Sequence, residues 1–319
     1  MLIAESVAPS TRKKYTTGYA TYRQFCIMTN LQPLPPTQHS LILFATFLST
    51  SLSHKNINIH LAGVKYHAQI LGYDPDLTPY VRLYRLLRGI KRTQGNKFSK
   101  PPRAPITPAL LMRLGTNLWN SSREHQDKLM VWAAMLMAFH GFMRISEYTS
   151  SHARSYNPST TLCWDDITIM PNTVKVRIKA SKTDPFRTGV DIMLYRNHSP
   201  LCPVQALIHY SHHHPFPHGP LFTWKNGSCL TRSSFAKTLQ KIKPPDIANM
   251  STHSFRIGAA TTAAAAGFPR WLIQALGRWS SDCYREYIRI PPTTLKNVSH
   301  SLATAIYTPT TPLDPDNAP

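Results

Sequence analysis

The sequence is poor in acidic residues. Aspartate and glutamate total 15 of 319 residues, against 36 lysines and arginines, so the formal net charge is +21. A protein with this imbalance attracts polyanions, and nucleic acid is the first partner that the composition indicates. The alternative is a basic protein of the ribosomal type, or one whose charge only keeps it in solution.

The sequence also has few cysteines and no long apolar run. The cysteines are scattered, are odd in number and include no Cys-x-x-Cys pair: Cys26, Cys163, Cys202, Cys229 and Cys283. This pattern indicates neither a disulfide framework nor a zinc site, and it favours a reducing compartment. No apolar stretch approaches the roughly 18 residues of a membrane span, and no basic segment followed by an apolar one opens the chain. We therefore expect no membrane association and no secretory signal.

The apolar residues that are present, 42 % of the chain, suffice for packed cores, and the length suits two domains. Residues 1–100 are expected to form a helical domain. This domain is basic, because the net charge of residues 1–104 is +11. The Pro-rich stretch that follows predicts a linker at 101–106. A second domain is expected at 107–307, and the Pro- and Asp-rich tail at 308–319 is expected to be disordered.

Hydrophobic periodicity predicts many helices and a few short strands. In the first domain, helices are expected from Pro9 to about Cys26 and at about 38–51, 55–71 and 79–91. In the second domain, an apolar helix is expected at 129–142 and strands at 162–169, 174–178 and 190–194. Helices are then expected to continue to about Tyr307. The predicted fold class is mainly α with a small antiparallel β-sheet (α+β).

One predicted helix of the first domain is strongly basic. Arg82, Arg85, Arg88 and Arg92 recur at steps of three and four residues, which places them on one helix face. Lys97 and Lys100 follow, and no acidic residue lies between Arg82 and Arg103. Because a solvated surface usually mixes charges of both signs, this stripe favours a track for nucleic-acid phosphates. The alternative is an ordinary exposed helix face.

Two patterns in the second domain each contain one prominent cation. Arg144 follows an apolar helix and stands three residues before Glu147, and an arginine in such a place needs an anion. That anion can be a ligand or simply Glu147. Lys182 lies where one strand is expected to turn into the next, so it can reach a phosphate or donate a proton. It can equally be a solvated turn lysine, and Lys179 is the nearby competitor.

Two further patterns follow. Ser251 or Thr252 is expected to cap a helix whose first turn carries His253 and Arg256, and such a helix end with an arginine suits a phosphate. The alternative is a basic pair on a surface helix. Farther on, Gly-Arg-Trp at 277–279 is expected to close a helix that Pro269 opens. A short helix then carries two tyrosines, which taken singly are ordinary residues of a core edge.

In this order, the four patterns resemble the tyrosine recombinase, or phage integrase, family over the whole chain. The ending Gly-Arg-Trp-Ser-Ser-Asp at 277–282, followed by Tyr284 and Tyr287, is similar to the recombinases of eukaryotic mobile elements of the DIRS-like and Crypton-like kinds. The resemblance implies a helical core-binding domain of the SAM-like type, a linker and a catalytic domain. It implies the catalytic set Arg144, Lys182, His253, Arg256, Trp279 and Tyr287, with Glu147 and Arg278 in support.

The resemblance also implies a mechanism. Arg144 and Arg256 would hold the nonbridging oxygens of the scissile phosphate. Tyr287 would attack and form a 3′-phosphotyrosyl bond, while Lys182 would protonate the 5′-oxygen that leaves. His253 would assist proton transfer. No metal and no cofactor would be needed, because the cationic side chains supply the charge stabilisation.

The sequence departs from the family pattern at one position. The family usually places a histidine or tryptophan nine residues before the nucleophile, whereas here Arg278 stands nine residues before Tyr287 and Trp279 stands eight before it. Trp279 is favoured for the role, since an indole N–H can donate to a phosphate. Tyr284 lies five residues after Trp279, which is too close for the family spacing, so Tyr287 is favoured as the nucleophile.

The implied function is a site-specific recombinase or integrase, acting on double-stranded DNA and serving the integration of a mobile element. By resemblance it would work as a homotetramer on two DNA sites, in the nucleus if the source is eukaryotic and otherwise in the cytoplasm on DNA. A helix at about 292–307 could dock on a neighbouring protomer or pack on its own. The alternatives are a type IB topoisomerase-like enzyme, a domesticated DNA-binding protein that does not cut, and a basic structural RNA-binding protein.

Overall fold

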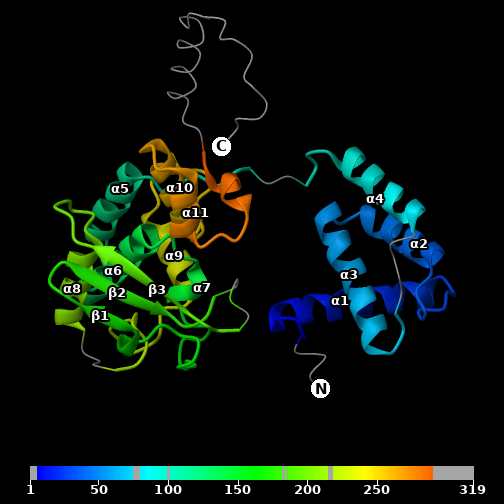
Figure 1. The fold of residues 1–319 in the computed structure, drawn as a ribbon, viewed down its shortest axis with the longest axis horizontal. Coiled ribbons are helices and arrows are strands. Elements are labelled where there is room, and N and C mark those ends of the chain that lie inside the picture. Colours follow the sequence, from blue (N-terminus) through cyan, green and yellow to red (C-terminus); the bar gives the residue numbers. More distant parts are fainter. Residues whose placement is uncertain are drawn as a thin grey trace, which may run out of the picture. The chain divides into compact units, whose positions relative to one another are not determined.

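The computed structural model of the chain describes residues 6–74, 80–98, 101–181, 184, 186–214 and 218–289. The chain forms two compact units, Met1–Pro101 and Pro102–Pro319, each with its own core (Figure 1). Four features expected from the sequence lie outside the described residues: Lys100, Lys182, the helix at 292–307 and the tail at 308–319.

The described part of the first unit is helical. Its helices are α1 (Pro9–Met28), α2 (Gln38–Ser49), α3 (His54–Ile70) and α4 (Val81–Gln94). Helix α1 packs against α3, and α2 contacts α3 and α4, around a core that includes Tyr22 and Phe44. The crossing of α1 and α3 is close, because a Cβ added at Gly63 would lie 2.5 Å from the Tyr15 carbonyl oxygen.

Helix α4 ends three residues later than expected. The side chain of Gln94 accepts a hydrogen bond from the His54 amide (2.8 Å) and donates to the carbonyl of Leu52 (2.8 Å). These bonds to the connection between α2 and α3 and to the start of α3 hold the last turn of α4 in helical form, which local periodicity could not reveal.

The second unit combines helices with three strands. Its helices are α5 (Pro108–Trp119), α6 (His125–His140), α7 (Ile145–Tyr148), α8 (Pro203–His213), α9 (Arg232–Ile242), α10 (Ser254–Ala265) and α11 (Arg270–Gly277), with short 3₁₀ helices η2 (Trp164–Asp166) and η3 (Asp282–Tyr287). The strands are β1 (Ile167–Ile169), β2 (Thr173–Ile178) and β3 (Val190–Tyr195).

The three strands form one antiparallel sheet in the order β1-β2-β3, and they lie side by side in Figure 1. Val176 of β2 pairs with Ile167 on one side and with Ile192 on the other. Alternate residues of β2, including Val174 and Val176, are buried against the helices. The predicted fold class, mainly α with a small antiparallel sheet, is confirmed.

The prediction of a strand over 162–169 is wrong for its first half. The Asp166 amide donates to the Cys163 carbonyl (3.1 Å) and closes a 3₁₀ turn, and the Asp166 carboxylate caps that turn by accepting from the Cys163 amide (2.8 Å), so the strand begins only at Ile167. Short aspartate side chains compete in this way with strand hydrogen bonds. The sequence could not show that this competition prevails here.

Helix α6 runs through the core of the second unit. All residues from Leu129 to Phe139 except Trp132 are buried, on every side of the helix, which explains why its sequence shows no polar face. It starts at His125, one turn before the apolar run. Helix α10 packs on α6, and it approaches the chain at Ile106 so closely that a Cβ at Gly258 would lie 1.9 Å from the Ile106 carbonyl oxygen. These contacts fix the start of α10 beside the end of α6.

Candidate active site

A sharp turn after α6 places Arg144. The helix ends at His140, and Phe142 takes a left-handed conformation (φ 49°) before Arg144 becomes the N-cap residue of α7. The Arg144 amide and guanidinium both donate to the carboxylate of Glu147, each at 2.9 Å. The pair with Glu147, which the sequence offered as the alternative to a ligand, therefore forms, and it lies at the start of α7 rather than at the end of the apolar helix.

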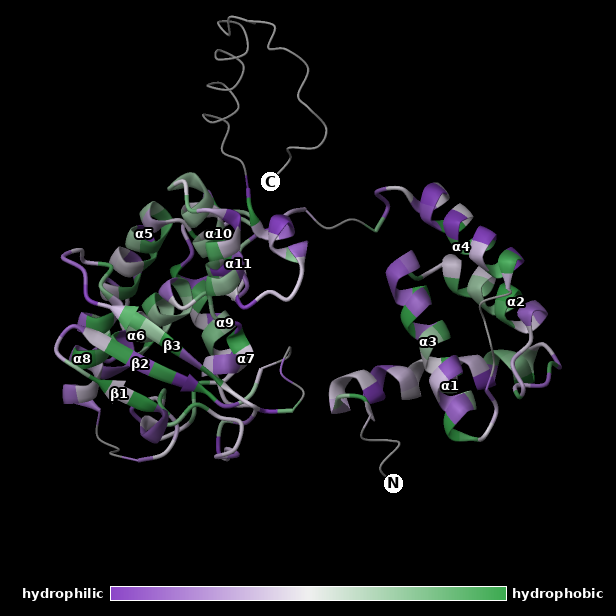
Figure 2. Ribbon diagram, viewed as in Figure 1, coloured by the Kyte–Doolittle hydropathy of each residue, from purple (hydrophilic) through white to green (hydrophobic). Residues whose placement is uncertain are grey.

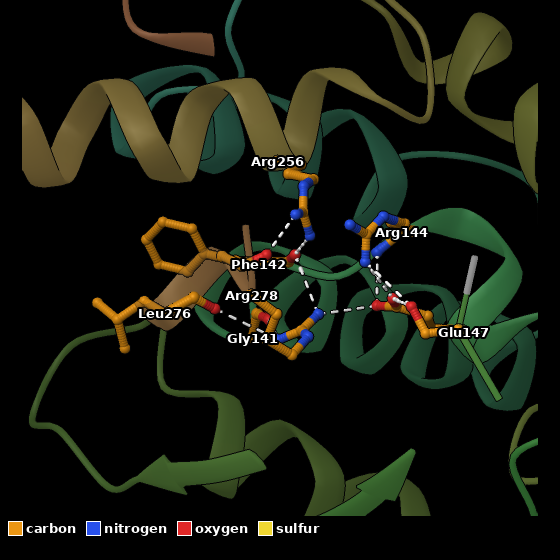
Figure 3. A network of polar contacts seen from close by, with 9 residues as sticks. Gly141, Phe142, Arg144, Glu147, Arg256, Leu276 and Arg278 are labelled. Atoms are coloured by element: carbon orange, nitrogen blue, oxygen red, sulfur yellow. Dashed lines mark hydrogen bonds and ion pairs between the residues drawn. The ribbon is translucent and has the colours of Figure 1, made fainter. Parts of the chain in front are cut away.

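Glu147 is the centre of a polar network (Figure 3). Its side chain is fully buried and also accepts from the Ser181 hydroxyl (2.9 Å) and from Arg278 Nη2 (2.8 Å). Burial acts to raise the pKa of this carboxyl, but the charges and hydrogen bonds of Arg278 and Arg144 outweigh it and lower the pKa below its ordinary value. Glu147 is therefore ionised at neutral pH and joins two arginines from distant segments.

The first turn of α10 differs from the expectation. His253, and neither Ser251 nor Thr252, is the N-cap residue, and its side chain does not cap the helix. The Ser251 hydroxyl instead accepts from the His253 amide (3.3 Å). His253 is half-buried, and burial together with the charges of nearby arginines lowers its pKa to about 4. The imidazole is therefore neutral at pH 7.

Arg256 is fully buried, so it is not part of a surface pair. Its two Nη atoms donate to the carbonyls of Phe142 and Gly277, and its guanidinium lies 4.2 Å from the centre of the Trp279 ring. In the described part of the chain no carboxylate bonds to it, and its Nε has no partner. Burial and the charges of Arg144 and other arginines lower its pKa to about 9. A cation in this condition gains from an anionic ligand.

The structure separates the two candidates before the tyrosines. Arg278 is in the left-handed conformation (φ 53°), and its Nη atoms donate to Glu147 and to the main-chain carbonyls of the turn after α6, including Gly141 (3.0 Å). Trp279 is 6 % exposed, lies over Arg256, and carries an indole N–H without a partner among the described residues. Arg278 thus supports the network, while Trp279 holds an uncommitted donor beside Arg256.

The two tyrosines of η3 have different surroundings. Tyr284 is 2 % exposed and belongs to the hydrophobic core. The Tyr287 ring is only partly buried and lies 5.1 Å from the His253 ring, 5.0 Å from the Trp279 ring and 5.8 Å from the Arg256 guanidinium. Tyr287 is therefore the tyrosine of η3 that lies beside both an imidazole and the Arg256 guanidinium.

The turn between β2 and β3 is described in part. Lys182 lies outside the described residues, but its competitor Lys179 is paired with Asp166, Nζ to Oδ2 2.6 Å. Ser181 lies inside the network: its hydroxyl also accepts from Arg144 Nη1 (3.1 Å). No sequence pattern pointed to Ser181, because a serine beside a turn is ordinary and only the tertiary structure brings it to Glu147.

The basic stripe of the first unit lies on α4. Arg82, Arg85, Arg88 and Arg92 are all exposed, and α4 is mainly purple in Figure 2. Leu83 and Ile90 hold the opposite face in the core. A groove of about 610 Å³ lies between α4 and the start of α3, and its lining includes Arg88, Arg92 and the His54 side chain.

Within the described ranges, no helix is long and apolar enough to cross a membrane. Among the same residues, no cluster of three or more His, Cys, Asp or Glu side chains could hold a metal ion.

No protein-family model matches the chain, and no curated protein sequence matches it. Solved structures do match. XerH site-specific recombinase bound to a difH substrate is 15 % identical, with a TM-score of 0.57 over 90 % of this chain and 78 % of that one. A lambda integrase dimer bound to a COC′ core site is 13 % identical, with a TM-score of 0.57 over 89 % and 72 %. The Tn1549 transposon integrase in complex with circular intermediate DNA is 15 % identical, with a TM-score of 0.50 over 84 % and 86 %. These similarities show that the chain has the fold of the tyrosine recombinases.

Proposed function

We propose that this chain is a site-specific DNA recombinase or integrase that breaks and rejoins strands through a 3′-phosphotyrosyl intermediate on Tyr287. The observation that carries the proposal is the meeting of Tyr287 and Trp279 with His253 and Arg256 in one place, from two separate segments of the chain. The solved proteins with the same fold include recombinases and integrases bound to DNA.

The charges of the site suit the transition state of phosphoryl transfer. Arg144, Arg256 and Arg278 against the single carboxylate of Glu147 leave two net positive charges in the described part of the site. Attack on a phosphodiester concentrates negative charge on its nonbridging oxygens, and fixed cations in a buried site stabilise that charge strongly. Arg144 and Arg256 would supply this stabilisation, and the resemblance assigns it to the same two residues.

The closeness of the His253 and Tyr287 rings supports one of the two proton transfers. The neutral imidazole of His253 would accept the phenol proton as the Tyr287 oxygen bonds to phosphorus. The bond from phosphorus to the 5′-oxygen breaks, and Lys182 would protonate that oxygen. The phosphotyrosyl bond keeps the energy of the phosphodiester, so a 5′-hydroxyl can reseal the strand in the reverse steps.

We assign the remaining phosphate contact to Trp279 rather than to Arg278. The Trp279 indole N–H has no partner among the described residues and lies beside the Arg256 guanidinium, which supports this assignment. The first unit would act as the core-binding domain, with the stripe on α4, Lys97 and Lys100 contacting DNA phosphates.

The test is a covalent trap on nicked suicide duplexes that carry the end sequences of the element. Wild type is expected to accumulate a protein–DNA adduct, Tyr287→Phe is expected to give none, and Tyr284→Phe is the matched control that keeps it. If wild type forms no adduct, the enzyme proposal fails and a DNA-binding protein remains. Adduct from Tyr287→Phe that disappears in Tyr284→Phe would move the nucleophile.

The wider setting is proposed on the resemblance alone. The resemblance of the sequence at 277–287 to DIRS-like or Crypton-like recombinases supports integration of a mobile element and a nuclear location. Strand exchange between two sites needs two cuts on each, which supports a homotetramer on DNA. Relaxation of supercoils without exchange between two sites would instead indicate a type IB topoisomerase-like enzyme.

A further inference from the structure

The Ser181 hydroxyl lies between the two charged groups at the centre of the site. It donates to Glu147 Oε1 (2.9 Å) and accepts from Arg144 Nη1 (3.1 Å), which itself lies 2.9 Å from the same carboxylate oxygen. Glu147 is fully buried and also bound by Arg278, so this oxygen has a fixed position. Hydrogen bonds to charged groups are about twice as strong as neutral ones.

Ser181 also begins the turn between β2 and β3. It forms an isolated antiparallel bridge with Asp184, and the Asp184 amide donates to the Ser181 carbonyl (3.1 Å). The Asp184 carboxylate accepts from the amides of Thr188 (3.1 Å) and Gly189 (2.8 Å), just before β3. The turn is thus bound to β3 through Asp184 and to the helical part of the site through Ser181. Lys182 is the next residue after Ser181.

We propose that Ser181 is a positioning residue for Lys182, an inference that rests on the proposed function. A lysine has a long, flexible side chain, so its ammonium is placed well only if its backbone is held. The bond from Ser181 to Glu147 ties the residue directly before Lys182 to the same carboxylate that orients Arg144. In this proposal Glu147 positions both the general acid, Lys182, and the phosphate-binding Arg144.

The role assigned to Lys182 makes the proposal specific. As the Tyr287 oxygen bonds to phosphorus, the bond to the 5′-oxygen breaks, the ammonium gives its proton to that oxygen, and the lysine is left as a neutral amine. A sulfur in place of the 5′-oxygen needs no proton, because a thiol has a pKa of roughly 8.5 and leaves readily as the thiolate. A defect in proton donation thus disappears on a 5′-bridging phosphorothiolate, whereas a defect in phosphate binding persists.

The experiment measures single-turnover cleavage of matched duplexes with 5′-oxygen or 5′-sulfur leaving groups. Since general acids contribute about 10²–10⁴-fold, Ser181→Ala is expected to slow the oxygen substrate about 10- to 100-fold and to cleave the sulfur substrate within about twofold of wild type. Ser181→Thr, which keeps the hydroxyl, is expected to restore the oxygen rate. Two variants serve as references: Lys182→Ala should slow only the oxygen substrate, as expected for a lost general acid, and Arg144→Ala should slow both substrates, as expected for a lost phosphate contact. Ser159→Ala, at an exposed serine, is the matched control.

Each outcome is decisive for Ser181. Equal slowing of both substrates by Ser181→Ala would show that the hydroxyl acts through Arg144 or the fold, and would overturn the proposal. Unchanged rates on both substrates would also overturn it. Cleavage by wild type on the oxygen substrate tests the proposed function separately, so the two failures are distinguishable.

Discussion

Replacing Glu147 with glutamine should destabilise the second unit strongly. The substitution keeps the shape of the side chain but removes the charge, and it turns an acceptor oxygen into an N–H₂ group that faces donors. Four hydrogen bonds now end on this carboxylate, from Arg144 (two), Ser181 and Arg278. Without the negative charge of Glu147, the positive charges of Arg144, Arg278 and Arg256 repel one another inside the protein.

The magnitude follows from the burial of the partners. Removing one member of a buried ion pair costs about 3–5 kcal/mol. The Arg144 and Arg278 side chains are 16 % and 15 % exposed, so water screens the remaining charges in part. We therefore expect the lower end, about 3 kcal/mol, which corresponds to a fall in Tm of about 6–12 °C for a unit of this size. Glu124→Gln, in an exposed pair with Lys225, should cost less than about 0.5 kcal/mol.

The assay is urea unfolding of wild type and Glu147→Gln as a function of pH. The folded-state pKa of Glu147 lies below its ordinary value of 4.5, so its contribution is fully present above pH 4.5 and is lost as pH falls through the folded-state pKa. The two proteins should therefore differ at neutral pH and converge in strong acid. A difference below about 1 kcal/mol at neutral pH, or one that persists unchanged in acid, would refute the reasoning.

Three further predictions rest on single features. Gly277→Ala places a Cβ 1.6 Å from an atom of the Trp279 indole ring, so it should lower the free energy of unfolding by at least about 1–3 kcal/mol and perturb the near-UV circular dichroism. The control is Gly89→Ala on α4, where a Cβ meets open space. It should raise Tm by the equivalent of about 0.5–1 kcal/mol. Proton NMR should show His253 titrating near pH 4. Because this pKa lies below the ordinary value of 6.5, the neutral imidazole favours folding above pH 6.5, and that contribution to stability is lost as pH falls toward 4. A midpoint near 6.5 would contradict the burial argument. Changing Arg85 and Arg88 to Glu should flatten the dependence of log Kd on log salt by about two phosphate contacts in fluorescence anisotropy, and an unchanged slope would reject the phosphate track.

The sequence by itself determined many of the elements and the order of the candidate residues along the chain. Hydrophobic periodicity is a local property, so it located α1 to α4, the apolar α6 and strands β2 and β3 to within a few residues. Net charge and the spacing of arginines on α4 are likewise readable along the chain, and by themselves they indicate a polyanionic partner. The predicted element boundaries were wrong where a side chain took a backbone hydrogen bond, as the Asp166 carboxylate did ahead of β1.

Only the tertiary structure decided which groups each polar residue contacts. Arg278 and Trp279 are neighbours in the sequence, yet one bonds to Glu147, 131 residues earlier, and the other lies over Arg256. Ser181 enters the site through a bond to a carboxylate 34 residues before it. Burial, and with it the lowered pKa of Arg256 and of His253, also depends on distant segments. The physical reason is that hydrogen bonds, charge and desolvation act over a few ångströms in space, whereas a sequence records only neighbours along the chain.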